Sequence, residues 1–136
     1  MSCIDLVVGP QHPALHEPER FVFKVEGERV IDVEPRIGYV HRGIEKALEG
    51  RTFVTGVYLA ERVCGICNVA HSLCYVQAME DVCSVEPPRR ALFLRVVAHE
   101  LNRIHSHMLL LGVAGELLGF MTLFMLLWRD LSLIHI

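Results

Sequence analysis

The stretch that decides the organisation of this chain is Glu61-Arg62-Val63-Cys64-Gly65-Ile66-Cys67-Asn68-Val69-Ala70-His71. Two thiols three residues apart can bind one metal ion from a tight turn, and a glycine between them lets the backbone bend. Arg62 adds positive charge, which favours the thiolate form of a nearby cysteine. His71 follows Cys67 by one helical turn, so its ring can reach back to the sulfur as a hydrogen-bond donor.

The spacing of this cysteine pair leaves several interpretations open. Isolated pairs of this kind occur in zinc, iron–sulfur and thioredoxin-type sites. A structural zinc site needs a second pair of ligands, and none follows in the sequence; a thioredoxin site needs a βαβ context, whereas helical patterns flank this turn. Cys74 could add a third thiol. We therefore predict metal binding, with buried, unliganded thiols as the alternative.

Helical patterns lie on both sides of the turn. Thr52 can cap a helix that runs toward Arg62, and a second helix is predicted from about Asn68 to Val82. Pro87-Pro88 can open a third helix, because proline is tolerated in a first helical turn. The third helix carries one apolar stripe, formed by Ala91, Leu94, Val97, Ala98, Leu101, Ile104 and Met108.

Residues 108–128 form a long apolar segment whose one charged residue is Glu116. The segment is long enough to cross a bilayer, and Gly115 and Gly119 have the spacing of a helix-dimer face in membranes. We favour a helix buried within a larger α-rich protein instead. Glycines at 112, 115 and 119 are expected to break the segment, and a central carboxylate is costly in lipid.

The sequence before these helices predicts a small β layer. An apolar run from Cys3 to Val8 leads into a proline-rich loop, residues 9–18, which holds two histidines and Glu17. Alternating apolar residues predict a β-hairpin over residues 21–33, which turns at Glu26-Gly27 and is ended by Pro35. A helix over about residues 42–48 would stop at Gly50. We expect an α+β fold, with a β region at 1–36, a helical region at 37–130 and a separate tail at 131–136.

Composition limits the functions that the chain can have. Of its 136 residues 52% are hydrophobic, which excludes a disordered tail. Basic residues number 13 and acidic residues 16, so the net charge is −3 and we expect no nucleic-acid partner. The 5 cysteines are odd in number and no signal peptide opens the sequence, which favours a reducing, cytoplasmic setting. No glycine-rich nucleotide loop occurs, so we expect no NAD site.

Several motifs occur together and in a characteristic order. They are Gly9-Pro10-Gln11-His12-Pro13-Ala14, Ile37-Gly38-Tyr39-Val40-His41-Arg42-Gly43-Ile44-Glu45-Lys46, Tyr58-Leu59-Ala60-Glu61, Arg62-Val63-Cys64-Gly65-Ile66-Cys67 with His71, and Glu100-Leu101-Asn102-Arg103-Ile104-His105-Ser106-His107. The set resembles the catalytic (large) subunits of membrane-associated, energy-converting (group 4) [NiFe]-hydrogenases, which are related to the 49 kDa subunit of respiratory complex I. The resemblance spans residues 9–130 and implies the N-terminal part of that fold.

The resemblance implies roles for particular residues. Cys64 would be a terminal nickel thiolate, and Cys67 would bridge nickel and an iron that carries CO and cyanide. Glu17 would transfer protons, and Glu45 is a possible magnesium ligand. The residues that would act around the thiolates are Arg62 and His71. The whole protein would interconvert H2 with protons and electrons, with an iron–sulfur small subunit and membrane-arm subunits as partners, as a peripheral protein on the cytoplasmic face of the cell membrane.

Two other functions stay open. Complex I subunits of this type bind quinone through a histidine, which matches His16, and a tyrosine, whose position is Gly65 here. They carry an aspartate at the position of Cys64, so the thiols favour the hydrogenase over a quinone-reducing subunit. A non-catalytic thiolate module that binds metal is the third possibility.

Two departures from the family concern the extent of the sequence. The family completes four thiolates with a second CxxC motif near its C-terminus, and this sequence contains none. Residues 131–136 do not resemble the family, so we expect a truncated reading frame with a foreign tail. We expect this fragment to be inactive by itself. In addition, Met121 stands where the family has an acidic residue in a Gly-Phe-Asp-Thr motif.

Overall fold

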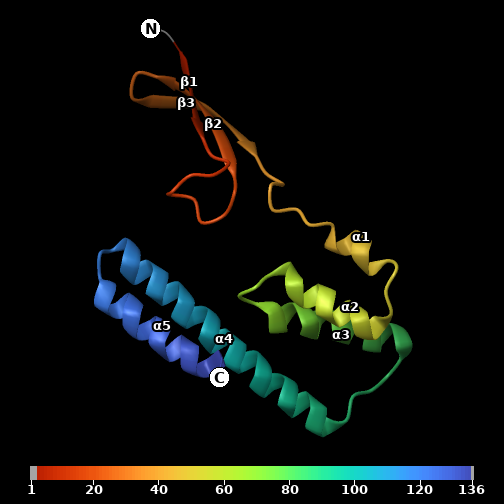
Figure 1. The fold of residues 1–136 in the computed structure, drawn as a ribbon. Helices are drawn as coiled ribbons and strands as arrows, with labels where there is room; N and C mark the ends of the chain where they lie inside the picture. Colours follow the sequence, from red (N-terminus) through yellow and green to blue (C-terminus); the bar gives the residue numbers. More distant parts are fainter. Residues whose placement is uncertain (1–2, 136) are drawn as a thin grey trace. The chain divides into compact units, whose positions relative to one another are not determined.

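The computed structural model describes residues 3–135 of the chain. The chain forms two compact units that divide between Gly43 and Ile44. The first unit is built on a small antiparallel sheet and the second consists of helices (Figure 1). The α+β class is therefore confirmed, whereas the boundary between residues 36 and 37 stays a prediction.

The sheet has three strands in the order β1-β2-β3, and its bounds are β1 (Ile4–Val8), β2 (Arg20–Glu26) and β3 (Arg29–Arg36). The hairpin of β2 and β3 is confirmed, with Gly27 in the turn at φ +63°. The expectation that Pro35 ends the hairpin is wrong, because Pro35 lies within β3 opposite Phe21. Since β3 is an edge strand, proline can occupy it without breaking a hydrogen bond to a further strand.

The proline-rich loop between β1 and β2 is fixed at its base. The backbone N–H of Glu19 donates to the carbonyl of Pro10 at 3.2 Å, and Ala14 N–H donates to Nδ1 of His12 at 3.2 Å. Gly9 has a φ of +87°, and a Cβ added to it would lie 1.8 Å from the carbonyl oxygen of Glu19. Only glycine fits at this position, so the residue that opens the loop also sets its course.

The second unit follows the expected order of helices. Thr52 caps helix α2 (Phe53–Ala60) by accepting a hydrogen bond from Thr55 N–H at 3.4 Å, and Pro88 immediately precedes helix α4 (Arg89–Leu117). Both predicted helix starts are confirmed. The helices are α1 (Ile44–Leu48), α2 (Phe53–Ala60), the 3-10 turn η1 (Glu61–Val63), α3 (Asn68–Cys83), α4 (Arg89–Leu117) and α5 (Met121–His135).

The apolar segment of residues 108–128 is divided between α4 and α5, which run side by side as a hairpin (Figure 1). Gly119 provides the break, with a φ of +77°. The expectation that Gly112 and Gly115 also break the segment is wrong. Both are buried within α4, where the missing side chains let Trp128 and Leu123 of α5 approach closely.

No helix among residues 3–135 combines the length and the apolar character needed to cross a membrane. Helix α5 continues through Leu131, which is 6% exposed, into the predicted tail. The foreign origin of residues 131–136 stays a prediction, and residue 136 lies outside the described residues.

Much of the apolar surface of the second unit is open. The stripe predicted on α4 is present, but Leu94, Val97, Leu101 and Ile104 are each about half exposed. Among the described hydrophobic side chains, by contrast, the buried ones are Ala60 and Leu131. Helices α3 and α5 cover only part of α4, and these four side chains of the predicted stripe are among those left open.

Gly56 allows α2 to approach α3 closely. A Cβ added to it would lie 2.1 Å from Oη and 2.7 Å from Cζ of Tyr75. The ring is stiff, so Gly56→Ala should force the two helices apart and destabilise the protein by about 1–3 kcal/mol. Denaturant unfolding would measure this change. Gly50→Ala is the matched control, since nothing lies within 4 Å of its added Cβ, and an equal loss in both variants would refute the packing argument.

Helices α3 and α4 are joined by a two-pronged ion pair between Glu80 and Arg95, both largely shielded from solvent. Nη1 of Arg95 donates to Oε2 of Glu80 at 2.8 Å, and Nη2 donates to Oε1. These hydrogen bonds hold the pKa of Glu80 below its usual value. The pair ties the later part of α3 to the early part of α4.

The lowered pKa of Glu80 predicts a pH dependence of stability. The ionised carboxylate is favoured in the folded state, so the pair stabilises the protein fully above the ordinary carboxyl pKa of about 4.3. This stabilisation should disappear as the pH falls through the lowered pKa. Wild type and Glu80→Gln should therefore differ in unfolding free energy at neutral pH and converge in acid, as denaturant titrations at several pH values would measure. A constant difference would contradict the assignment.

Candidate metal centre

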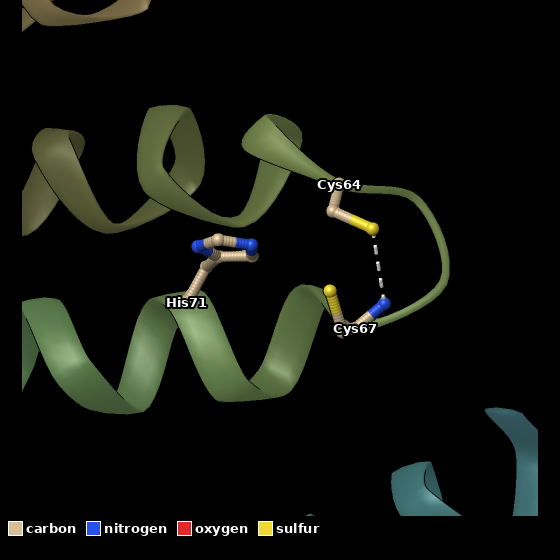
Figure 2. Close-up of side chains that lie close together, drawn as sticks. All are labelled: Cys64, Cys67 and His71. Atoms are coloured by element: carbon tan, nitrogen blue, oxygen red, sulfur yellow. Dashed lines mark hydrogen bonds between the residues drawn. The ribbon is translucent and has the colours of Figure 1, made fainter. Parts of the chain in front are cut away.

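The two cysteines lie at the ends of a turn that reverses the chain between η1 and α3. Cys64 follows η1 with extended backbone angles of φ −140° and ψ 132°, and Cys67 is the N-cap residue of α3. The backbone N–H of Cys67 points at Sγ of Cys64 at 3.5 Å, as the dashed line in Figure 2 marks. The turn thus places both sulfur atoms on its inner side.

His71 completes the cluster from the first turn of α3. Its backbone N–H donates to the carbonyl of Cys67 at 3.3 Å, which fixes its place one helical turn after that residue. The imidazole ring points toward the two sulfur atoms (Figure 2). One ring nitrogen and both Sγ atoms lie within 4.8 Å of one another, and all three side chains are half-buried.

This donor set fits a soft transition metal. Atoms bound to one cation at about 2.3 Å (sulfur) and about 2.1 Å (nitrogen) lie at most about 4.6 Å apart, so small side-chain rotations suffice. Thiolate and imidazole donors select zinc, nickel, copper or iron over magnesium or calcium. Among residues 3–135 the cluster offers two thiols and one imidazole, so it fits such a metal but is smaller than the set of four or more ligands that the metal needs.

The two thiols affect one another's ionisation. Cys64 interacts with the Cys67 thiol and raises its pKa above the usual value, and partial burial acts in the same direction. Two thiolates side by side repel, so without a cation the pair tends to retain a proton. A bound metal ion supplies the positive charge that allows both sulfurs to ionise.

Arg62 lies beside the turn but pairs with another residue. Its Nη1 lies 3.0 Å from Oε1 of Glu61, and the side chain is exposed. The proposed effect of its charge on the thiolates stays a prediction. Cys74, considered as a third thiol, is exposed and does not belong to the group of potential ligands found among residues 3–135.

The other predicted site residues lie elsewhere in the chain. His16 and Glu17 line an open hollow of about 400 Å³ formed by the proline-rich loop of the first unit. Glu45 is exposed on α1. The structure brings together Cys64, Cys67 and His71, and the roles assigned to His16, Glu17 and Glu45 stay predictions.

Sequence reasoning missed one residue at this site. Nδ2 of Asn102 on α4 donates to the carbonyl of Ile66 at 3.1 Å and to Oδ1 of Asn68 at 3.2 Å. Both acceptors adjoin Cys67. A polar, poorly helix-forming asparagine inside a long helix was the available signal, but its partner lies more than thirty residues earlier in the sequence.

Comparisons with known proteins agree with this geometry. The membrane-bound hydrogenase subunit alpha of Pyrococcus furiosus is 44% identical over 125 residues, which are 92% of this chain and 29% of that protein. The D component of the NADH-quinone oxidoreductase of Carboxydothermus hydrogenoformans is 41% identical over 131 residues, which are 96% of this chain and 36% of that protein. The chain thus spans about a third of the length of these relatives.

A solved structure has the same fold. In the membrane-bound sulfane sulfur reductase (MBS), an archaeal respiratory membrane complex, one chain matches with a TM-score of 0.85 and 26% identity, covering 97% of this chain and 35% of its own length. The profile of the nickel-dependent hydrogenase family matches residues 42–111, which include both cysteines and His71. The chain therefore belongs to the nickel-dependent hydrogenase family.

Proposed function

We propose that this chain is part of the catalytic subunit of a membrane-associated [NiFe]-hydrogenase, which interconverts H2 with two protons and two electrons. The observation that carries the proposal is the cluster of Cys64, Cys67 and His71, whose ligand atoms lie within 4.8 Å of one another. Membership of a nickel-dependent family supports nickel as the metal. The remaining thiolates would come from the second CxxC motif expected in the family.

Cys64 and Cys67 would hold the metals from one side. A nickel–iron centre, with CO and cyanide on the iron, would supply an open coordination position and the redox chemistry of H2 cleavage. The turn between η1 and α3 would hold the two cysteines on the same side for the metals. The ring of His71 would hydrogen-bond a sulfur or reach the metal itself, and in either case it limits the rotation of the thiolates.

Protons need a separate route from electrons. Glu17 would accept the proton released when H2 splits and pass it on toward solvent, as a carboxylate close to a metal-bound thiolate can do. Its open loop suits this task, since water reaches the hollow that the loop forms. Glu45 would contribute to a magnesium site, and Arg62 would add positive charge near the thiolates.

The related proteins belong to membrane-bound complexes by name, and this supports partners of the same kind. An iron–sulfur small subunit would receive the electrons. Membrane-arm subunits would hold the protein on the cytoplasmic face of the cell membrane as a peripheral component. No NAD site is proposed in this chain.

A quinone-reducing subunit of the complex I type is the second candidate. The specific observation in its favour is the 41% identity to a component of an NADH-quinone oxidoreductase. His16 would then contact the quinone headgroup. The paired thiols count against this function, because quinone binding has no need of two sulfurs and an imidazole directed at one point. A non-catalytic metal-binding module would use the same cluster without the hydrogen chemistry.

Metal analysis of the complete protein, purified with its partner subunits, separates the candidates. Stoichiometric nickel and iron together with H2-dependent dye reduction would support the hydrogenase. Absence of nickel with quinone reduction would support the complex I type, and zinc without either activity would support the non-catalytic module. The last two results would each refute the proposal.

A further inference from the structure

The CxxC turn is attached to a helix that carries none of the potential metal ligands found among residues 3–135. Asn102 lies on α4, and its side-chain amide donates to the carbonyl of Ile66 at 3.1 Å and to Oδ1 of Asn68 at 3.2 Å. Ile66 lies between the two cysteines, and Asn68 directly follows Cys67. The two hydrogen bonds therefore hold the chain immediately before and immediately after the second thiol.

The chemistry of an amide suits this position. Both partners of Asn102 are oxygen atoms that accept, so the NH2 group must face them and the amide oxygen must face away. A serine or threonine would offer a single donor, and a carboxylate would offer none at neutral pH. Few side chains of this size can make both bonds, which indicates that asparagine at this position serves the conformation of the turn.

Asn102 is one of two described polar links between α3 and α4. The ion pair of Glu80 and Arg95 joins the same two helices, with Glu80 near the end of α3 and Asn68 at its start. Loss of the amide would therefore release the turn while the helices stay joined. Variants of Asn102 and of the ion pair can therefore distinguish a role in stability from a role in placing the thiol.

We propose that Asn102 is a positioning residue for the metal-binding turn: it holds the backbone around Cys67 so that the sulfur faces Cys64 and His71 before a metal binds. The inference rests on the proposed nickel site. A rigid turn lowers the entropy that metal binding must overcome, and outer hydrogen bonds to metal ligands commonly change metal affinity about 10–100-fold.

The test uses Asn102→Leu, which keeps the size of the side chain and removes both donors, and Asn102→Ala, which removes the side chain. The complete protein in its metal-free form is titrated with Ni²⁺ against a competing chelator. Both variants should raise the Kd for Ni²⁺ about 10-fold or more. Wild-type affinity in Asn102→Leu would overturn the proposal.

A second measurement does not depend on nickel. Alkylation of the thiols in the metal-free protein, followed peptide by peptide, should become faster at Cys64 and Cys67 in both variants. The exposed thiols of Cys74 and Cys83 serve as internal standards. Unchanged relative rates would overturn the proposal even if the wild type proved to hold no nickel, so its failure can be told apart from failure of the proposed function.

Arg95→Leu is the control for a merely structural effect. It should lower the thermal midpoint through loss of the ion pair with Glu80 while the Kd for Ni²⁺ stays within about twofold of wild type. Equal weakening of Ni²⁺ binding in Arg95→Leu and Asn102→Leu would contradict a specific positioning role. So would loss of folded protein in both Asn102 variants, because the ion pair should keep the helices together.

Discussion

Replacement of Cys64 or Cys67 by serine in the complete protein should abolish nickel binding and H2-dependent dye reduction. Each thiolate is a direct ligand in the proposed site, so its loss should exceed the 10–100-fold effect of an outer hydrogen bond and reduce activity by more than about 100-fold. A serine hydroxyl is a poor ligand for a soft metal at neutral pH. Elemental analysis and a dye-reduction assay on the same preparations would measure both losses.

Cys83→Ser is the matched control for this experiment. Cys83 is exposed at the end of α3, so the same chemical change there should leave nickel content and activity as in wild type. Full nickel content in Cys64→Ser and Cys67→Ser would show that these two cysteines do not bind the nickel. Loss of activity in the control as well would indicate damage to the fold rather than to the ligands.

Glu17→Gln should remove most of the H2 turnover and leave the metals in place. The amide cannot take up a proton, and general acid–base groups commonly contribute about 10²–10⁴-fold to a rate. Because glutamine has nearly the size of glutamate, the change removes the proton acceptor while the backbone hydrogen bond at the base of the loop stays in place. Dye reduction should therefore fall by at least about 100-fold while nickel and iron per protein stay at wild-type values.

Glu19→Gln, at the base of the same loop, is the companion variant. The backbone N–H of Glu19 holds the base of the loop, and this bond survives the substitution. Turnover should therefore stay close to wild type. Equal losses of turnover in the two variants would mean that any charge change in the loop disturbs it. Loss of nickel in Glu17→Gln would mean that Glu17 helps to hold the metal instead of moving protons.

Local signals predicted the parts of the fold that depend on neighbouring residues. Thr52 and Pro88 mark helix starts because caps act within one turn. The CxxC spacing and His71 predicted the cluster because all three lie within two turns of chain. The sequence did not predict the pairing of β1 with β2, or Pro35 inside β3, because strand position in a sheet is decided by distant partners.

Contacts made across long stretches of sequence were beyond prediction for the same reason. From the sequence, Gly112 and Gly115 were expected to break the helix, and only the approach of α5 gives them their role as contact points. Asn102 has no local partner that marks it. The relation of Glu17 to the thiols was inferred from family resemblance alone, since neither charge nor spacing links a loop in one unit to a turn in another.

The hairpin of α4 and α5 has a consequence for the order of folding. Gly115 and Leu123 are close in sequence, so the loop that joins them closes at little entropic cost, and this hairpin should be among the earliest structures to form. The bonds from Asn102 to the cysteine turn span a much longer stretch of chain and should form later. The cysteine turn would therefore reach its fixed conformation only after α4 has docked against α3.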